Sequence, residues 1–278
     1  KGGSVFSLQL LLEGLDKSVF HPVVVCPRAG TFTHKLTELN IDWEVATLLS
    51  FSIGKTVSLF DFLKMWIKYF MGTIKLLYLI KKHRVSLVHT NSMFLIGGAI
   101  AAKLGRIPHI WHIRDILSDP NHHFIFKRNK IRKMINDLST KIICISKFVA
   151  KEINENQSIK SPKIIVVHNA INIREFNMLK KKHENEKIII GTVGTFQKRK
   201  QQHIIPGLVK EIIKRDNDLS FEWHIYGQIT GTSKKYYDVV AKAIKEQDLE
   251  KHCVLKGLRN KIDIYSSLDI LVHTAILE

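Results

Sequence analysis

The sequence has few acidic residues, few cysteines and no long apolar run, and each shortage excludes a class of protein. Lys and Arg number 43 against 25 Asp and Glu, so the net charge is +18 and the surface should attract phosphates, anionic lipid or nucleic acid. Cys26, Cys144 and Cys253 are odd in number and lie in apolar contexts. They indicate buried thiols in a reducing cytoplasm and argue against a disulfide framework or a metal site. No apolar run reaches the roughly 18 residues of a membrane-spanning helix, and no signal peptide is visible.

The 278 residues suffice for two domains of ordinary size, and the apolar fraction of 45% is that of a globular protein. The chain begins at Lys1 without an initiator Met, and it stops at Glu278, in the middle of the exit from a predicted strand. We therefore expect a piece of a longer protein, truncated at both ends, with an incomplete C-terminal domain.

Short apolar strands alternate with helical patterns along the whole chain. The predicted strands are 22–27, 43–48, 85–90, 107–113, 141–145, 163–167, 188–193, 221–226, 253–255 and 270–273. The predicted helices are 5–15, 33–39, 56–84, 95–104, 131–138, 147–152, 204–214, 236–247 and 262–266. This alternation predicts an α/β protein with parallel, doubly wound sheets. A polar stretch, 173–187, divides it into two Rossmann-like domains in tandem, 1–172 and 188–278, whose ligands should lie at the carboxyl ends of the strands.

The stretch 188–206 reads IIIGTVGTFQKRKQQHIIP, a buried strand followed by a glycine-rich, basic turn. It contains no acidic residue. Glycines allow backbone N–H groups to approach a ligand, and cations beside a helix start favour phosphate. The turn is a candidate anion-binding site; the alternative is an ordinary strand-to-helix turn with solvated lysines.

The predicted helix 56–84 is rich in aromatic and basic residues, and three lysines, Lys64, Lys68 and Lys75, fall near one face. Such a helix could lie on an anionic membrane surface, or it could be a core helix with solvated lysines. A second basic cluster could contact lipid or an acceptor phosphate, or simply be exposed: Lys127, Arg128, Lys130, Arg132 and Lys133.

Nine stretches, taken in order and spacing, resemble the family 4 retaining glycosyltransferases of the GT-B fold. They are GG near the start, VSLVHTNS, IPHIWHIRD, KIICISKFVAKEI, KIIVVHNAINIREF, GTVGTFQKRKQ, HIYGQ, VLKGL and SSLDILVHTAILE. The resemblance covers nearly the whole chain. It implies an N-terminal acceptor domain, a C-terminal nucleotide-sugar domain, no metal or other cofactor, and transfer with retention at the anomeric carbon.

In this family an Arg/Lys pair neutralises the donor diphosphate. Here Gly194 matches a glycine of the family motif and Lys200 matches its lysine. Thr195 stands where the family has the arginine, and Gln201 stands where it has a second glycine. Arg199 or Lys198 is expected to substitute for the arginine. Fixed cations at this place would stabilise charge on the departing diphosphate.

The resemblance implies further donor contacts. Gly2 and Gly3 match a glycine loop near the donor phosphates or the acceptor, and Gly227 with Gln228, and also Gly257, would lie near the base. Glu278 matches the first glutamate of an E-x7-E motif that contacts the donor sugar. The chain is expected to be inactive without the second glutamate.

At the end of the predicted strand 107–113 the family usually places a histidine, often before an acid, that faces the donor sugar. Arg114 occupies this position, His112 lies two residues earlier, and Asp115 could orient either. The sequence does not decide which of the two faces the sugar. His112 could also be a purely structural histidine at the end of a strand. Ser146 is expected to cap the helix 147–152.

The sequence thus predicts a metal-independent, retaining hexosyltransferase. It would use a UDP- or GDP-linked sugar and a lipid-linked or polysaccharide acceptor, and it would lie peripherally at the cytoplasmic face of an anionic membrane. The alternatives are a nucleotide-sugar 2-epimerase of the same fold and a non-catalytic basic binding protein. No RNA-binding signature is present, so a nucleic-acid partner is not expected.

Overall fold

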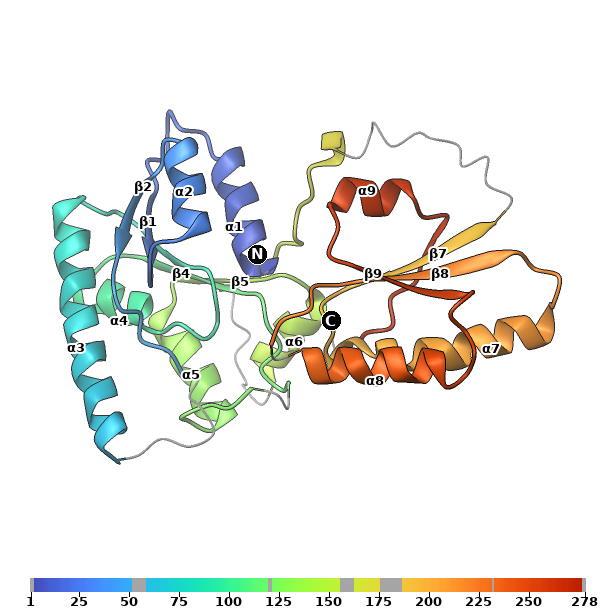
Figure 1. The fold of residues 1–278 in the computed structure, drawn as a ribbon. Coiled ribbons are helices and arrows are strands. Elements are labelled where there is room, and N and C mark those ends of the chain that lie inside the picture. The colour runs from blue at the N-terminus through green and yellow to red at the C-terminus, as the bar shows by residue number, and fades with distance from the viewer. Residues whose placement is uncertain are drawn as a thin grey trace. The chain divides into compact units, whose positions relative to one another are not determined.

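The structure is a computed structural model that describes residues 3–51, 59–119, 122–155, 163–175, 187–231 and 233–276. The chain divides into two compact units, residues 1–171 and 172–278. In both units strands and helices alternate as predicted (Figure 1).

The first unit contains six strands and six helices within the described residues. They are α1 (Gly3–Gly14), β1 (Val23–Cys26), α2 (Thr31–Glu38), β2 (Asp42–Val45), α3 (Leu59–Lys82), β3 (Val88–Thr90), α4 (Gly97–Leu104), β4 (His109–Ile113), α5 (Arg128–Leu138), β5 (Lys141–Cys144), α6 (Lys147–Asn154) and β6 (Ile164–Val166). Strands β3 to β6 form a parallel sheet in the order β3-β4-β5-β6, while β1 and β2 form a separate parallel pair.

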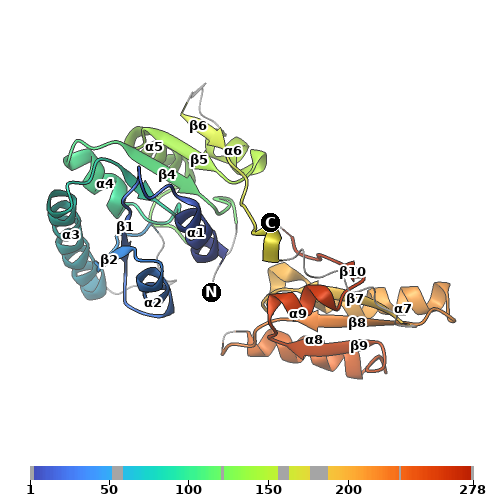
Figure 2. The ribbon, with the colours of Figure 1, turned by 90° about the horizontal axis from the view of Figure 1, so that it is seen from above.

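The second unit has one sheet. Its elements are η1 (Ile173–Glu175), β7 (Ile188–Val193), η2 (Lys198–Lys200), η3 (Gln202–Ile204), α7 (Ile205–Arg215), β8 (Phe221–Tyr226), α8 (Lys234–Lys245), β9 (Cys253–Gly257), α9 (Lys261–Ser266) and β10 (Ile270–Leu271). The sheet is parallel in the order β10-β7-β8-β9. Helices α7 and α8 lie on one face and α9 on the other, as Figures 1 and 2 show. The prediction of doubly wound parallel sheets is confirmed.

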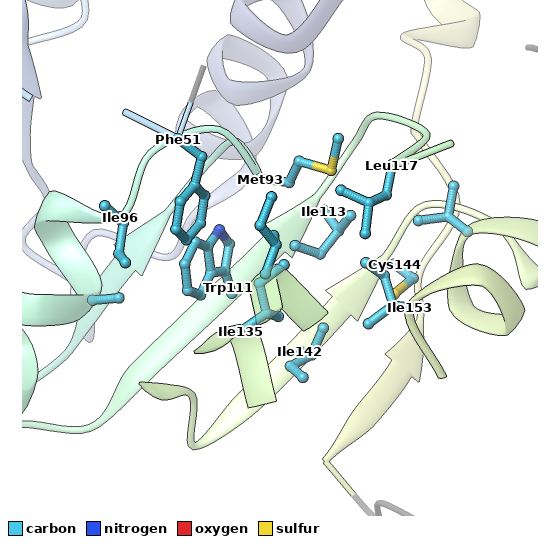
Figure 3. Close-up of a cluster of buried hydrophobic side chains, with 13 residues drawn as sticks. Phe51, Met93, Ile96, Trp111, Ile113, Leu117, Ile135, Ile142, Cys144 and Ile153 are labelled. Carbon is cyan, nitrogen blue, oxygen red and sulfur yellow. The ribbon is translucent and has the colours of Figure 1, made fainter. Parts of the chain in front are cut away.

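The core of the first unit is built around Trp111 in the middle of β4 (Figure 3). Its ring is fully buried and stacks on Phe51 with the centroids 6.1 Å apart, and its Nε1 donates to the carbonyl of Ser92 at 2.8 Å. A large aromatic ring with its polar atom satisfied packs in one orientation. Strand β4 therefore provides a fixed base for the residues that follow it.

In the second unit, alternate residues of β8 face opposite ways. Phe221, Trp223 and Ile225 join the apolar core, which also contains residues of α7 and α8. Because side chains alternate along a strand, Glu222 and His224 point to the other face, where His224 Nε2 lies 3.0 Å from a carboxylate oxygen of Glu222. The apolar side chains therefore anchor β8, which pairs with β7, in the core.

All three cysteines are free thiols buried in the fold, as predicted. Burial raises the pKa of the Cys26 thiol and raises the pKa of Cys144 and Cys253 to about 12. Burial in an apolar interior disfavours the thiolate, so these thiols are packing residues.

The cap predicted at Ser146 is confirmed, because its hydroxyl accepts a hydrogen bond from the backbone N–H of Val149 at 3.2 Å.

The basic cluster of α5 is less uniform than the sequence suggested. Arg132 is buried and pairs with Glu155 at 2.7 Å, so it holds α5 to the end of α6 and is not a surface cation. Within the described ranges, no helix combines the length and apolar character needed to span a bilayer.

Candidate active site

Polar side chains gather around Arg114, which follows β4 at the carboxyl edge of the first unit's sheet. Its Nε donates to Asn91 Oδ1 at 2.8 Å, and its Nη1 donates to Asn169 Oδ1 at 2.6 Å. Asn91 follows β3, and its own Nδ2 donates to the carbonyl of Ser4 in the first turn of α1 at 3.0 Å. The two asparagines therefore fix the guanidinium beside the start of α1, where the predicted site residue Gly3 lies.

His112 lies deeper than Arg114 and is only 8% exposed. Its ring stacks on that of His89 with the centroids 5.5 Å apart, and its Nδ1 is 3.4 Å from Arg114 Nη2. Burial, helped by the charge of Arg114, lowers the pKa of His112 to about 3 and the pKa of His89 to about 4. Both imidazoles are therefore neutral at physiological pH, and neither can serve there as a cation.

Arg114 is partly exposed and is the cation of this cluster. Burial lowers the pKa of Arg114, and the neighbouring carboxylate of Asp115 acts in the opposite direction. An arginine stays charged despite such a shift, so the cluster presents a guanidinium with its geometry set by two amide oxygens. This arrangement suits the binding of a phosphate or a sugar hydroxyl.

In the second unit, the turn after β7 brings the predicted basic residues together. Gln202 is completely buried, and its Nε2 donates to the carbonyls of Gly194 at 3.3 Å and Thr195 at 3.1 Å. Gln201 adopts the left-handed conformation, with φ of 52°. This conformation costs a residue with a side chain about 1–2 kcal/mol, and such strain is often found at functional sites.

The side chain of Lys200 folds back over Gly194. A Cβ atom on Gly194 would lie 3.5 Å from Cδ and 3.6 Å from Cε of Lys200. Burial, followed by the charge of Arg199, lowers the pKa of Lys200 to about 8. The ammonium is therefore protonated in most molecules at pH 7, but it is incompletely solvated, which makes it a good partner for an anion.

Backbone hydrogen bonds of three glycines also link the carboxyl ends of the neighbouring strands β7, β8 and β9. The N–H of Gly194 donates to the carbonyl of Tyr226 at 2.9 Å, and the N–H of Gly227 donates to that of Gly257 at 3.0 Å. A Cβ on Gly227 would lie 2.2 Å from the Gly194 carbonyl oxygen, so only glycine fits. Gly257 has a φ of +66°, a conformation that glycine adopts without strain.

The other predicted donor residues differ in exposure, and Arg199 Nε donates to Gln197 Oε1 at 3.1 Å. Thr195, Lys198 and Gln228 are exposed at the same edge, and Arg199 is partly exposed. Gly2 and Glu278 lie outside the described residues. Sequence reasoning missed Asn91, Asn169 and His89, although the first two follow predicted strands as amides, which is a usable signal. Among the residues that the structure describes, no three His, Cys, Asp or Glu side chains are close enough to hold a metal ion.

Comparisons with known proteins identify the family of the chain. The profile of the family described as Glycosyltransferase Family 4 matches residues 1–175. The capsular polysaccharide biosynthesis glycosyltransferase CapH of Staphylococcus aureus is 27% identical over 293 residues, which span 100% of this chain and 73% of CapH.

Two solved structures resemble both units. HepE of Anabaena in complex with UDP has a TM-score of 0.74 at 18% identity, covering 99% of this chain and 71% of HepE. A glycosyltransferase from Rickettsia africae has a TM-score of 0.70 at 17% identity, covering 98% of this chain and 69% of that one. At such identities the likeness shows the fold.

Proposed function

The chain belongs to glycosyltransferase family 4 and has the GT-B fold, and from this premise we propose that it transfers a sugar from a UDP- or GDP-linked donor, with retention, to a lipid-linked or polysaccharide acceptor. The second unit would bind the donor and the first the acceptor. Two relatives support the choice of substrates: HepE was crystallised with UDP, and CapH is described as an enzyme of capsular polysaccharide biosynthesis.

The observation that carries the proposal is the Lys200 turn. The partly buried Lys200 side chain lies over Gly194 near the carboxyl end of β7, and Arg199 is its neighbour in the turn. When the bond between the sugar and the diphosphate breaks, negative charge grows on the phosphate oxygens. Cations already held in place stabilise that charge without reorganisation. In this proposal Lys200 and Arg199 supply the stabilisation, and no metal ion takes part.

In the first unit we assign the sugar-facing or acceptor-facing role to Arg114, with Asp115 beside it. The contrast in exposure supports Arg114 over His112, because the imidazole of His112 is 8% exposed and stacked on His89. His112 then has a supporting role, as a buried neighbour whose Nδ1 lies 3.4 Å from Arg114 Nη2. Asn91 and Asn169 orient the guanidinium through its Nε and Nη1 atoms.

The acceptor would be reached at a membrane surface, through one face of α3. The exposed apolar side chains of this face are Trp66, Ile67, Phe70, Met71, Ile74 and Tyr78. Lysines at 64, 68 and 75 flank them, while Leu76 and Leu79 on the opposite side are buried. Figure 1 shows α3 beside α4 at the margin of its unit, where a face of this kind can be presented. An apolar stripe bordered by lysines fits the surface of an anionic bilayer, at the cytoplasmic face in this proposal.

Transfer assays test the proposed reaction. The full-length protein is incubated with radiolabelled UDP- and GDP-linked hexoses, without added metal, and with vesicles that carry a polyprenyl-diphosphate-linked sugar. We expect label to move into the lipid fraction and nucleoside diphosphate to accumulate. Release of a soluble epimerised sugar without any acceptor would identify a 2-epimerase instead. Salt-sensitive RNA binding that UDP and GDP leave unchanged would favour the non-catalytic alternative.

The substitution Phe70→Glu tests the membrane surface. Phe70 is 67% exposed at the centre of the α3 stripe, so a charge there should leave the fold intact and oppose insertion. We expect binding to vesicles containing phosphatidylglycerol to fall at least tenfold, since burying one aromatic side chain contributes about 1.5–3 kcal/mol. Vesicle co-sedimentation measures the change. The matched control is Phe148→Glu on α6, which replaces a side chain 54% exposed outside the stripe. Equal loss in both variants would contradict the assignment of α3.

A further inference from the structure

The segment that follows β10 runs along the Lys200 turn. Thr274 Oγ1 donates to the carbonyl of Lys200 at 2.6 Å, and the N–H of Ile276 donates to the carbonyl of Arg199 at 2.9 Å. On the other side, the N–H of Val272 donates to the carbonyl of Gly191 in β7 at 2.8 Å. These three bonds fix residues 272–276 against both the strand and the turn that carry the candidate donor site.

His273 lies between those bonds, at the carboxyl end of the sheet. It is an exposed side chain, and partial burial, followed by the charge of Lys200, lowers the pKa of His273. The charged groups on the neighbouring turn are Lys198, Arg199 and Lys200, all of which are cations. The imidazole therefore lies within electrostatic reach of the Lys200 ammonium, at an edge where positive charges repel one another in the absence of an anion.

We propose that His273 is a further ligand of the donor diphosphate, which it binds together with Lys200. The proposal rests on the proposed function of the Lys200 turn. A diphosphate placed beside Lys200 reverses the electrostatics around His273, since the anion attracts a proton where the lysine repels one. An imidazole also donates one N–H in its neutral form and two when protonated, so it contacts a phosphate oxygen in both states.

Proton uptake on binding follows from this geometry. Without ligand, His273 is neutral at pH 7, and a bound diphosphate raises its pKa. A group whose pKa is higher in the complex takes up a proton on binding, so affinity rises as the pH falls through the pKa of the complex. Lys200 titrates near pH 8 and is already charged at pH 7, so changes below pH 7 report on the histidine.

Titration calorimetry with UDP and GDP tests the proposal on the parent protein, His273→Gln, His273→Arg and Lys200→Ala at pH 6 and pH 8. Two buffers of different ionisation enthalpy give the number of protons taken up. The nucleotide's own phosphate titrates equally in every experiment, so the difference between proteins isolates the side chain. We expect His273→Gln to bind about 3- to 10-fold more weakly than the parent at pH 6, to bind equally at pH 8, and to take up fewer protons. His273→Arg should restore the affinity at pH 6 and, like His273→Gln, take up fewer protons than the parent.

Two outcomes would overturn the proposal, and they are distinguishable. If Lys200→Ala weakens binding while His273→Gln keeps the parental affinity and proton uptake at pH 6, His273 is not a ligand and the donor site stands. If neither nucleotide binds the parent protein, the proposed function of the turn fails and the role of His273 fails with it.

Discussion

Replacing Lys200 by alanine is expected to weaken UDP or GDP binding about 5- to 150-fold, which corresponds to roughly 1–3 kcal/mol for a lost charge-assisted contact. The rate of sugar transfer should fall further, by about 10²–10³-fold, because the ammonium acts most strongly on the charge of the leaving diphosphate. Calorimetry measures the affinity, and initial rates at saturating donor measure the transfer. The fold should survive, since burial opposes the charged form of Lys200 and its removal relieves that cost.

The control is Lys198→Ala, which removes an exposed cation of the same turn and is expected to cost less than threefold. The pH profile gives a second check. With a pKa of about 8, Lys200 loses its charge as the pH rises, so nucleotide affinity should decline above pH 8 in the parent and in Lys198→Ala. Lys200→Ala should lack that decline. Equal affinities of Lys200→Ala and the parent would remove Lys200 from the donor site.

Gly227→Ala is expected to damage both stability and donor binding. A Cβ atom would lie 2.2 Å from the Gly194 carbonyl oxygen and 3.0 Å from the Phe196 ring, so β8 and the Lys200 turn must move apart. Forcing a methyl group into a packed site costs about 1–3 kcal/mol. We expect the second unit to melt several degrees lower and UDP affinity to fall at least tenfold, as measured by thermal unfolding with and without nucleotide.

Gly207→Ala is the matched control, because a Cβ at this position of α7 meets nothing within 4 Å. Alanine favours the helix by about 0.5–1 kcal/mol relative to glycine, so the melting temperature should stay the same or rise. If Gly227→Ala behaved like Gly207→Ala, the carboxyl ends of β7 and β8 would be less tightly packed than the structure indicates.

Sequence patterns predicted the order and type of the helices and strands because most strands are short apolar runs and most helices have one apolar face. The misplaced boundaries have local causes. Strand β3 begins at Val88, three residues later than predicted. Arg84 adopts the left-handed conformation, and the N–H of Val85 donates to the carbonyl of Ile80, so these residues close α3 and cannot start the strand. Hydrophobicity alone does not reveal such a closure.

The candidate site was only partly predictable. Arg114 stands out because it is a cation directly after an apolar strand, and Lys200 stands out because it belongs to a run of three cations in the turn after another strand. Their partners do not, since Asn169 meets Arg114 across 55 positions of the sequence and Thr274 meets Lys200 across 74. The left-handed Gln201 was also not predicted, although the resemblance puts a glycine, which adopts a positive φ without strain, at this position. Long-range pairing and backbone strain depend on tertiary packing, which a motif does not encode.

The burial of all three thiols makes the folded chain inert toward thiol reagents, so labelling should begin only when a unit opens. Cys144 belongs to the first unit and Cys253 to the second, and mapping the labelled peptide would tell which unit opens first. Because the buried native thiols do not react, a spectroscopic probe can be attached to one introduced cysteine alone. A single cysteine introduced at Tyr78, on the exposed face of α3, would carry the only reactive label in the native protein and would report by fluorescence when that face meets lipid.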